Sequence, residues 1–152
     1  MSVSLHEQAP DFELTTADGT PLRLSSLRGR KVVLFFYPRD HTAGCTAQAC
    51  AFRDIYEELV TAGAEVVGVS SDSPETHHGF AARHALPFPI ASDPDGAVRR
   101  RYGASTRLLL NRTGRVTFLI DEQGVVRDIF VSLWRVGEHV ERARAWVSAI
   151  SR

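Results

Sequence analysis

Two apolar runs constrain the fold of this chain more than any other feature. Residues 31–37 and 64–70 consist mainly of apolar residues, without polar residues at every second position. Runs of this kind are typical of strands that are covered on both faces of a sheet. Helical periodicity follows each run, from about Thr42 to Thr61 and again from Ser73. These strand–helix–strand steps predict parallel pairing in the middle of a sheet.

Hairpins are predicted at the edges of this sheet. Residues 12–24 contain an Asp-Gly turn between two short extended segments, and residues 116–131 predict a second hairpin. A short helix is expected over residues 97–102 and a last helix over about 138–150. A chain of 152 residues suits one domain with its own core. We therefore expect residues 1–152 to form a single α/β domain, with a mixed central sheet, helices on both faces and an N-terminal β-hairpin.

Charge and hydropathy argue against two classes of partner. The chain has 18 basic and 18 acidic residues, whereas a nucleic-acid partner would favour a basic surface. The arginine run at 99–101 is predicted to be the solvated face of a short helix. No apolar run approaches the length that crosses a bilayer, and the N-terminus lacks the pattern of a signal peptide. We therefore expect a cytoplasmic protein without nucleic-acid or membrane partners.

The only two cysteines, Cys45 and Cys50, follow the first apolar run, where sheets of this kind place ligands. In a reducing compartment such a pair is more often catalytic, redox-active or metal-binding than a permanent brace. If Thr42 caps the following helix, Cys45 is its third residue, among unpaired amides at the positive end of the helix dipole. This position favours a thiolate. We expect the sulfur to be poorly shielded beside Gly44 and Thr42; an inert small apolar residue is the alternative. Pro38 ends the strand and could also shield the sulfur from water.

The spacing of the cysteines limits how they can pair. Five positions along an intact α-helix separate two Cα atoms by roughly 8–9 Å, whereas a disulfide requires less than about 7 Å. Either this disulfide never forms, or its formation unwinds the first turn or two of the helix. The second option supplies a mechanism in which Cys45 reacts first and Cys50 attacks it after the segment opens.

A structural zinc site is the main competitor for paired cysteines. Zinc requires four ligands at short spacing, and the chain has two cysteines and six scattered histidines. His77 and His78 are predicted to lie on a solvated helix face. We therefore expect no structural metal. The chain also lacks a Cys-x-x-Cys pair, which weighs against a thioredoxin-type dithiol exchanger.

The pattern Pro-x-x-x-Thr-x-x-Cys, formed by Pro38, Thr42 and Cys45, resembles the active-site signature of the peroxiredoxins. The longer stretch 36–54 resembles the bacterioferritin comigratory protein, or peroxiredoxin Q, branch of that family, and the likeness extends over nearly the whole chain. The resemblance implies a thioredoxin-like fold with an N-terminal extension. It also implies a peroxidase without metal, haem or flavin that reduces hydrogen peroxide and organic hydroperoxides. Thioredoxin or a glutaredoxin-like dithiol protein would be the reductant.

The resemblance assigns a role to five residues of this chain. Cys45 matches the peroxidatic cysteine, which becomes a sulfenic acid, and Cys50 matches the resolving cysteine. Thr42 matches the hydroxyl that binds the peroxide, and Pro38 matches the shielding proline. Arg115 takes the place of the arginine that stabilises the thiolate and the leaving oxygen; without the resemblance it would be an ordinary residue at the start of a strand.

Two departures from the branch concern the site. Ala43 stands where the branch usually has proline, which removes a pre-set first helical residue and favours unwinding. The stretch 102–115 is shorter than usual and borders the site, so it bears on substrate access. The branch is often monomeric, and we expect a monomer. Two other functions stay open: a dithiol–disulfide oxidoreductase on the same fold, and a peroxide sensor or relay that acts through protein binding.

Overall fold

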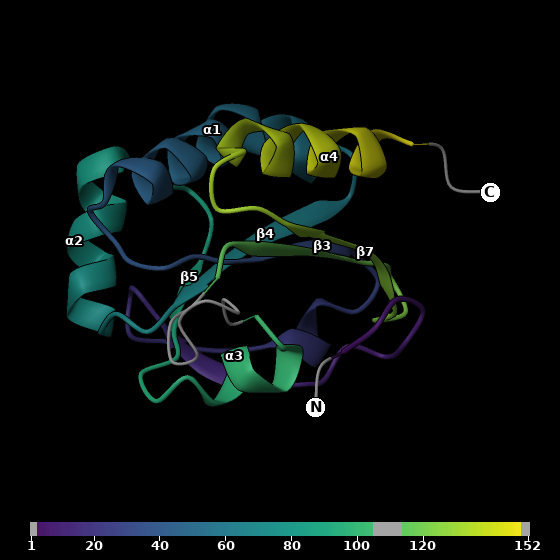
Figure 1. Cartoon of the computed structure of the whole chain (residues 1–152), viewed down its shortest axis with the longest axis horizontal. Helices are drawn as coiled ribbons and strands as arrows, with labels where there is room; N and C mark the ends of the chain where they lie inside the picture. The colour runs from purple at the N-terminus through teal and green to yellow at the C-terminus, as the bar shows by residue number, and fades with distance from the viewer. Residues whose placement is uncertain (1–2, 105–113, 150–152) are drawn as a thin grey trace.

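A mixed seven-stranded sheet forms the centre of the computed structural model, which describes residues 3–104 and 114–149 (Figure 1). The strand order is β2-β1-β5-β4-β3-β6-β7. Strands β3, β4 and β5 are parallel, and all other pairs are antiparallel. The prediction of a mixed sheet with parallel strands in the middle is therefore confirmed. The strands are β1 (Glu13–Thr16), β2 (Pro21–Arg23), β3 (Lys31–Phe36), β4 (Ala64–Ser70), β5 (Ile90–Ser92), β6 (Val116–Ile120) and β7 (Val126–Val131).

The central strand β3 is covered on both faces, as its apolar run predicts. Val32, Leu34 and Phe36 face one apolar cluster, while Val33 and Phe35 face another. Alternation of this kind follows from the two-residue period of a strand. Because both faces of β3 are buried, nearly all of its residues are apolar. The loop that follows its carboxyl end leads to α1.

Helices lie on both faces of the sheet, which confirms that prediction (Figure 1). One face is covered by α1 (Ala43–Thr61), α4 (Val136–Ser148) and α2 (Pro74–His84), whose apolar residues share a cluster with β3. The other face is covered by α3 (Ala97–Tyr102) and the 3-10 helix η1 (Leu24–Leu27). Within the described residues, no helix is both long and apolar enough to cross a membrane.

Details of three predicted helices differ from the structure. The sequence pattern predicts a helix that continues to Leu86, but α2 ends at His84, because Ala85 adopts a left-handed conformation with φ 51° and cannot continue it. Helix α4 begins at Val136, two residues earlier than expected, and the expected last residue, Ile150, lies outside the described residues. In α3 only Arg100 and Arg101 of the arginine run are exposed. Arg99 is buried, and its backbone N–H donates to Asp93.

Candidate active site

The loop between β3 and α1 brings three of the predicted site residues to one end of the sheet. Pro38 is half-buried directly after β3, and Thr42 is the N-cap of α1 with φ −91° and ψ 154°. The Thr42 hydroxyl does not cap a helix amide; it donates instead to the carbonyl of Arg39 at 2.9 Å. Cys45 is the third helical residue, as predicted, so its amide lacks a partner in the preceding turn.

Cys45 is more deeply buried than the sequence suggests. Its residue is 2% exposed and belongs to the apolar cluster under α1 and α4, so the expectation of a poorly shielded sulfur is wrong. Cys45 is the first buried position of α1, and it shares an apolar cluster with Phe35 and Tyr37 at the end of β3. Burial alone would fit an inert thiol. A cation beside the sulfur argues against that interpretation.

That cation is Arg115, which the structure places against Cys45. Arg115 directly precedes β6, and the pairing of Phe36 with Val116 brings it next to the end of β3. Its Nη2 donates to the Cys45 sulfur at 3.5 Å, and its Nε donates to the carbonyl of Leu133 at 3.2 Å. The arginine is 5% exposed. A buried guanidinium at this distance stabilises a thiolate more than a neutral thiol.

The glycine before Cys45 makes room for this contact. A Cβ atom at Gly44 would lie 3.0 Å from Nη2 of Arg115, closer than most real contacts of this kind. The guanidinium thus approaches the backbone at the helix start, and a larger residue there would push it away from the sulfur.

Gln48 is a site residue that the sequence analysis missed. It is fully buried one turn after Cys45, and its Oε1 accepts from Nη1 of Arg115 at 2.6 Å. Within the described part of the chain, its Nε2 is buried without a hydrogen-bond partner. A polar residue on the buried stripe of α1 was the available signal. Gln48 and Leu133 accept hydrogen bonds from Nη1 and Nε of Arg115, and this orients its Nη2 toward the Cys45 sulfur.

His139 supports this arrangement from α4 and was also missed. Its Nε2 donates to the carbonyl of Ser132 at 2.7 Å, and its Nδ1 lies 2.7 Å from the hydroxyl of Thr117. The Ser132 amide in turn donates to the carbonyl of Arg115 at 3.2 Å. Burial lowers the pKa of His139, and the charge of Arg115 acts in the same direction. The neutral imidazole therefore accepts from Thr117 and donates to Ser132.

Cys50 lies on the intact helix α1, and both cysteines are free thiols. Its residue is partly exposed, whereas Cys45 is buried. The helical separation of roughly 8–9 Å between their Cα atoms applies here, because α1 is continuous from Ala43 to Thr61. The structure therefore shows a form in which the two sulfurs cannot bond without a change of conformation.

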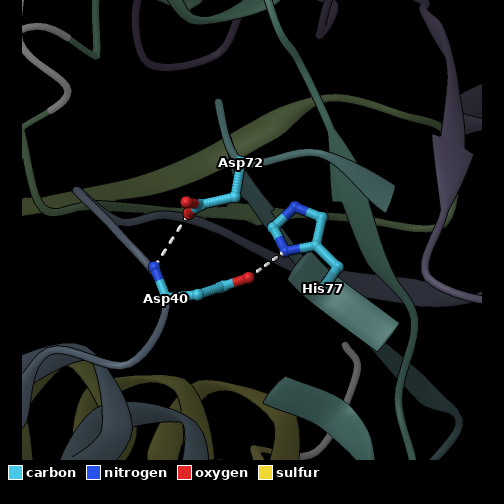
Figure 2. A group of neighbouring side chains, drawn as sticks. All are labelled: Asp40, Asp72 and His77. Atoms are coloured by element: carbon cyan, nitrogen blue, oxygen red, sulfur yellow. Dashed lines mark hydrogen bonds and ion pairs between the residues drawn. The ribbon is translucent and has the colours of Figure 1, made fainter. Parts of the chain in front are cut away.

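The prediction that His77 lies on a solvated helix face is wrong, although His78 is exposed. The His77 ring is fully buried because α2 turns it toward Asp40, and its Nδ1 lies 2.5 Å from a carboxylate oxygen (Figure 2). Asp40, Asp72 and His77 each offer a possible metal-ligand atom, all within 4.8 Å of one another. Both His77 nitrogens are occupied, however, by Asp40 and by the carbonyl of Ala91 at 3.1 Å.

A hollow of about 370 Å³ opens beside the start of α1. It is lined by Thr42 and by neighbours from the same loop, from α1 and from α2 (His41, Ala43, Thr46, Arg83 and His84). A small polar molecule can therefore reach Thr42 from solvent. Most of the segment 102–115, which the sequence analysis relates to substrate access, lies outside the described residues.

Comparisons with known proteins converge on one family. A family model described as the AhpC/TSA family matches residues 5–129. The chain is 44% identical over 132 residues to a protein of Sedum lineare named "Peroxiredoxin Q, chloroplastic", covering 87% of this chain and 71% of that protein. The chloroplastic relatives are longer proteins, of which the chain spans between 64% and 71%.

Two solved structures share the fold closely. The peroxidoxin BcpB of Mycobacterium tuberculosis superposes with a TM-score of 0.89 at 37% identity, covering 97% of this chain and 98% of that one. The bacterioferritin comigratory protein of Xanthomonas campestris superposes with a TM-score of 0.83 at 30% identity, covering 90% and 89%. That X. campestris protein has alkyl peroxide reduction activity, and its structure is a trapped intermediate or ligand complex. These matches confirm the predicted thioredoxin-like fold.

Proposed function

This chain belongs to the AhpC/TSA family and is a thiol peroxidase of the peroxiredoxin type, and we propose that Cys45 is the sulfur that reduces its peroxide. The observation that carries this assignment is the 3.5 Å contact between Nη2 of Arg115 and the Cys45 sulfur. A thiolate is the reactive form of cysteine, and a buried cation beside it favours that form.

In the first step, the Cys45 thiolate attacks the terminal oxygen of the hydroperoxide. A sulfur–oxygen bond forms as the oxygen–oxygen bond breaks, and the departing alkoxide or hydroxide takes up a proton. Cys45 is oxidised to a sulfenic acid, and the peroxide is reduced to an alcohol or water. Arg115 stabilises the negative charge as it moves from sulfur to the departing oxygen.

For Thr42 and Pro38 we propose the roles that the family resemblance implies. The Thr42 hydroxyl gives its hydrogen to Arg39, so its oxygen remains able to accept a hydrogen bond from the peroxide O–H. Pro38 is half-buried where the chain leaves β3 and limits the access of water to the sulfur. Thr42 then contributes to the rate by orienting the peroxide, and Arg115 contributes separately by stabilising the developing charge.

In the second step, Cys50 attacks the sulfenic acid of Cys45. A sulfur–sulfur bond forms, the sulfur–oxygen bond breaks, and water leaves. The intact helix α1 holds the two residues too far apart for this reaction, so its first turns must unwind. Thioredoxin or a glutaredoxin-like dithiol then reduces the disulfide, and is itself oxidised to a disulfide.

Hydrogen peroxide and organic hydroperoxides are the proposed substrates. The hollow beside Thr42 is open to solvent, and the X. campestris relative supports alkyl hydroperoxides as a class. The test is stopped-flow consumption of hydrogen peroxide and cumene hydroperoxide by the reduced protein. We expect Cys45→Ser to abolish the reaction. Cys50→Ser should keep the first turnover and lose recycling by thioredoxin.

The same experiment separates the other two functions. Reduced protein that reacts with peroxide no faster than free cysteine would contradict the peroxidase and favour a dithiol–disulfide oxidoreductase. Fast oxidation without recycling by any dithiol would favour a sensor or relay, whose partner could be trapped as a mixed disulfide. We also propose a monomer in the cytoplasm, where reducing dithiols are abundant. Light scattering of the purified protein and fractionation of the source cells test these two points.

A further inference from the structure

A group of polar side chains, all buried except the half-buried Asp72, anchors the loop that carries the reactive site, and we infer that it governs how readily this loop opens for disulfide formation. The group consists of Tyr37, Asp40, Asp72 and His77, and we call it the loop anchor. The inference rests on the proposed function, in which Cys45 reacts and Cys50 resolves it. The anchor residues contact neither sulfur, so they are positioning residues.

The anchor ties the reactive loop to two elements outside it. Asp40 lies between Pro38 and Thr42, whereas His77 belongs to α2 and Asp72 follows β4. Figure 2 shows the Asp40 and His77 side chains pointing toward each other, and Asp72 approaching the backbone nitrogen of Asp40. The segment 38–45, which carries three proposed site residues, is therefore held in place through Asp40.

All polar atoms of Asp40 except its carbonyl take part in these contacts. One carboxylate oxygen lies 2.5 Å from Nδ1 of His77, and the other accepts from the hydroxyl of Tyr37 at 2.5 Å. Its amide donates to Asp72 at 2.8 Å. Burial and the carboxylate of Asp40 raise the pKa of Tyr37 well above its usual range, so this hydroxyl keeps the proton that it donates.

The contacts of His77 show that a proton lies between it and Asp40. Nε2 faces the carbonyl of Ala91 at 3.1 Å, and a carbonyl only accepts, so Nε2 carries a hydrogen. A lone pair on Nδ1 would repel the carboxylate at 2.5 Å, so a second hydrogen is shared by these two atoms. The pair is neutral as a whole wherever that proton sits, which fits its complete burial. Hydrogen bonds of this kind are among the strongest in proteins.

The residue after Asp40 is held in an unfavourable backbone conformation. His41 has φ 63°, in the left-handed region that side chains other than glycine disfavour. It lies between the anchor and the first turn of α1, so the loop is bent sharply where the helix begins. Release of the anchor allows His41 to relax to an extended conformation, and strain of this kind persists only while surrounding contacts hold it.

These observations connect the anchor to the two chemical steps. We call the conformation with an intact α1 the closed form. With Asp40 fixed, this form keeps Cys45 against Arg115, which favours the reaction with peroxide. Disulfide formation requires the opposite, because the first turns of α1 must unwind. Weakening the anchor should therefore slow the peroxide reaction and speed disulfide formation. A change that only misplaced Arg115 would slow the peroxide reaction without speeding disulfide formation.

The test compares Tyr37→Phe, Asp40→Asn and His77→Asn with His78→Asn, which alters the exposed neighbour on the same helix. Stopped-flow fluorescence and sulfenic-acid trapping follow the two steps separately. For His77→Asn we expect disulfide formation about tenfold faster and a peroxide reaction several-fold slower, as for loss of a charge-assisted hydrogen bond. Asp40→Asn can still accept from Tyr37 and donate to Nδ1, so its effect should be smaller and of the same sign. His78→Asn should match the wild type.

Hydrogen exchange of the reduced proteins gives an independent readout. Backbone amides of residues 41–46 should exchange faster in His77→Asn and Asp40→Asn, whereas those of residues 52–59 should not change. Two rates that fall together, or that stay at the wild-type values in all three anchor variants, would overturn the inference. If His77→Asn fails to fold, Asp40→Asn and Tyr37→Phe decide the same question.

The outcome can be separated from that of the proposed function. A wild-type protein that does not reduce peroxide contradicts the peroxidase, yet exchange at residues 41–46 still tests the anchor. A working wild-type peroxidase whose anchor variants show unchanged exchange contradicts the anchor alone.

Discussion

Two buried polar groups lie on opposite sides of the reactive loop, and they differ in what they touch. On one side, Arg115 reaches the Cys45 sulfur itself and is held by Gln48 and Leu133. On the other side, the loop anchor holds the backbone around Asp40 and contacts neither sulfur. The first group brings charge to the reacting atom, while the second fixes the backbone that presents it. Both groups contain buried polar side chains. Such residues near a site can therefore either take part in the reaction or position the residues that do.

Apart from loss of Cys45 itself, removal of the cation should have the largest effect of all changes near the site. Arg115→Ala should lower the second-order rate with hydrogen peroxide by about 10²–10³-fold, since it removes the donor to the thiolate and to the departing oxygen. Stopped-flow measurement at saturating reductant gives this rate. His77→Asn is the matched comparison from the other group. An equal loss of the peroxide rate in both variants would contradict the distinction between the two buried groups.

Displacement of the cation should cost less than its removal. Gly44→Ala places a methyl group 3.0 Å from Nη2 of Arg115, so the guanidinium must shift away from the sulfur. We expect the peroxide rate to fall about tenfold, as for partial loss of one charged hydrogen bond. Ala43→Gly, at the preceding exposed position, is the control. A Gly44→Ala rate equal to that of the wild type would show that the close approach is unimportant.

Loss of the support for Arg115 should appear chiefly in stability. Gln48→Leu keeps the buried stripe of α1 but leaves Nη1 of Arg115 without its acceptor. The free energy of unfolding should fall by about 1–3 kcal/mol, the usual cost of a buried donor left unpaired. Urea denaturation of the reduced protein measures it. Gln48→Glu restores an acceptor and should recover most of the loss; a Gln48→Leu protein as stable as the wild type would contradict this role.

The smallest effect concerns pH and His139. Its pKa is lowered from 6.5 by burial, so the folded state favours the neutral ring. Above the unfolded value both states are neutral and stability is unaffected. As the pH falls below about 6.5, the unfolded chain binds the proton first and stability decreases. Denaturation midpoints on either side of that pH should show a loss that His139→Gln lacks, because Gln can donate to Ser132 without titrating. A parallel loss in both proteins would assign the effect to other groups.

The sequence was informative wherever one segment determines the outcome. The apolar runs predicted the central strands, and the spacing from Thr42 predicted the start of α1 and the position of Cys45 in its first turn. The separation of the two cysteines on an intact helix followed from the same local geometry. The ends of α2 and α4 were less certain, because a single residue such as Ala85 can leave the helix without a strong sequence signal.

Contacts between distant segments were the part that could not be predicted. Arg115 lies 70 positions from Cys45, and only the family resemblance pointed to it. His77 lies 37 positions from Asp40, so its burial depends on how α2 packs against the loop. The Cys45 sulfur was expected to be poorly shielded because of Gly44 and Thr42, and nothing near it in sequence shows that α4 packs against the same apolar cluster. The catalytic roles of the five site residues, and the single domain over residues 1–152, stay predictions (Cys45, Cys50, Thr42, Arg115 and Pro38).

The depth of Cys45 also bears on which oxidants can reach it. With 2% of the residue exposed, the sulfur lies beneath the surface of the closed form. A hydroperoxide offers a narrow end of two oxygen atoms, whereas glutathione disulfide or an alkylating reagent must bring bulky groups along with its electrophilic atom. We therefore expect the closed form to act as a steric sieve. Selectivity for peroxides over other thiol-reactive compounds would then come from the narrow shape of the peroxide as much as from the nucleophilicity of the sulfur.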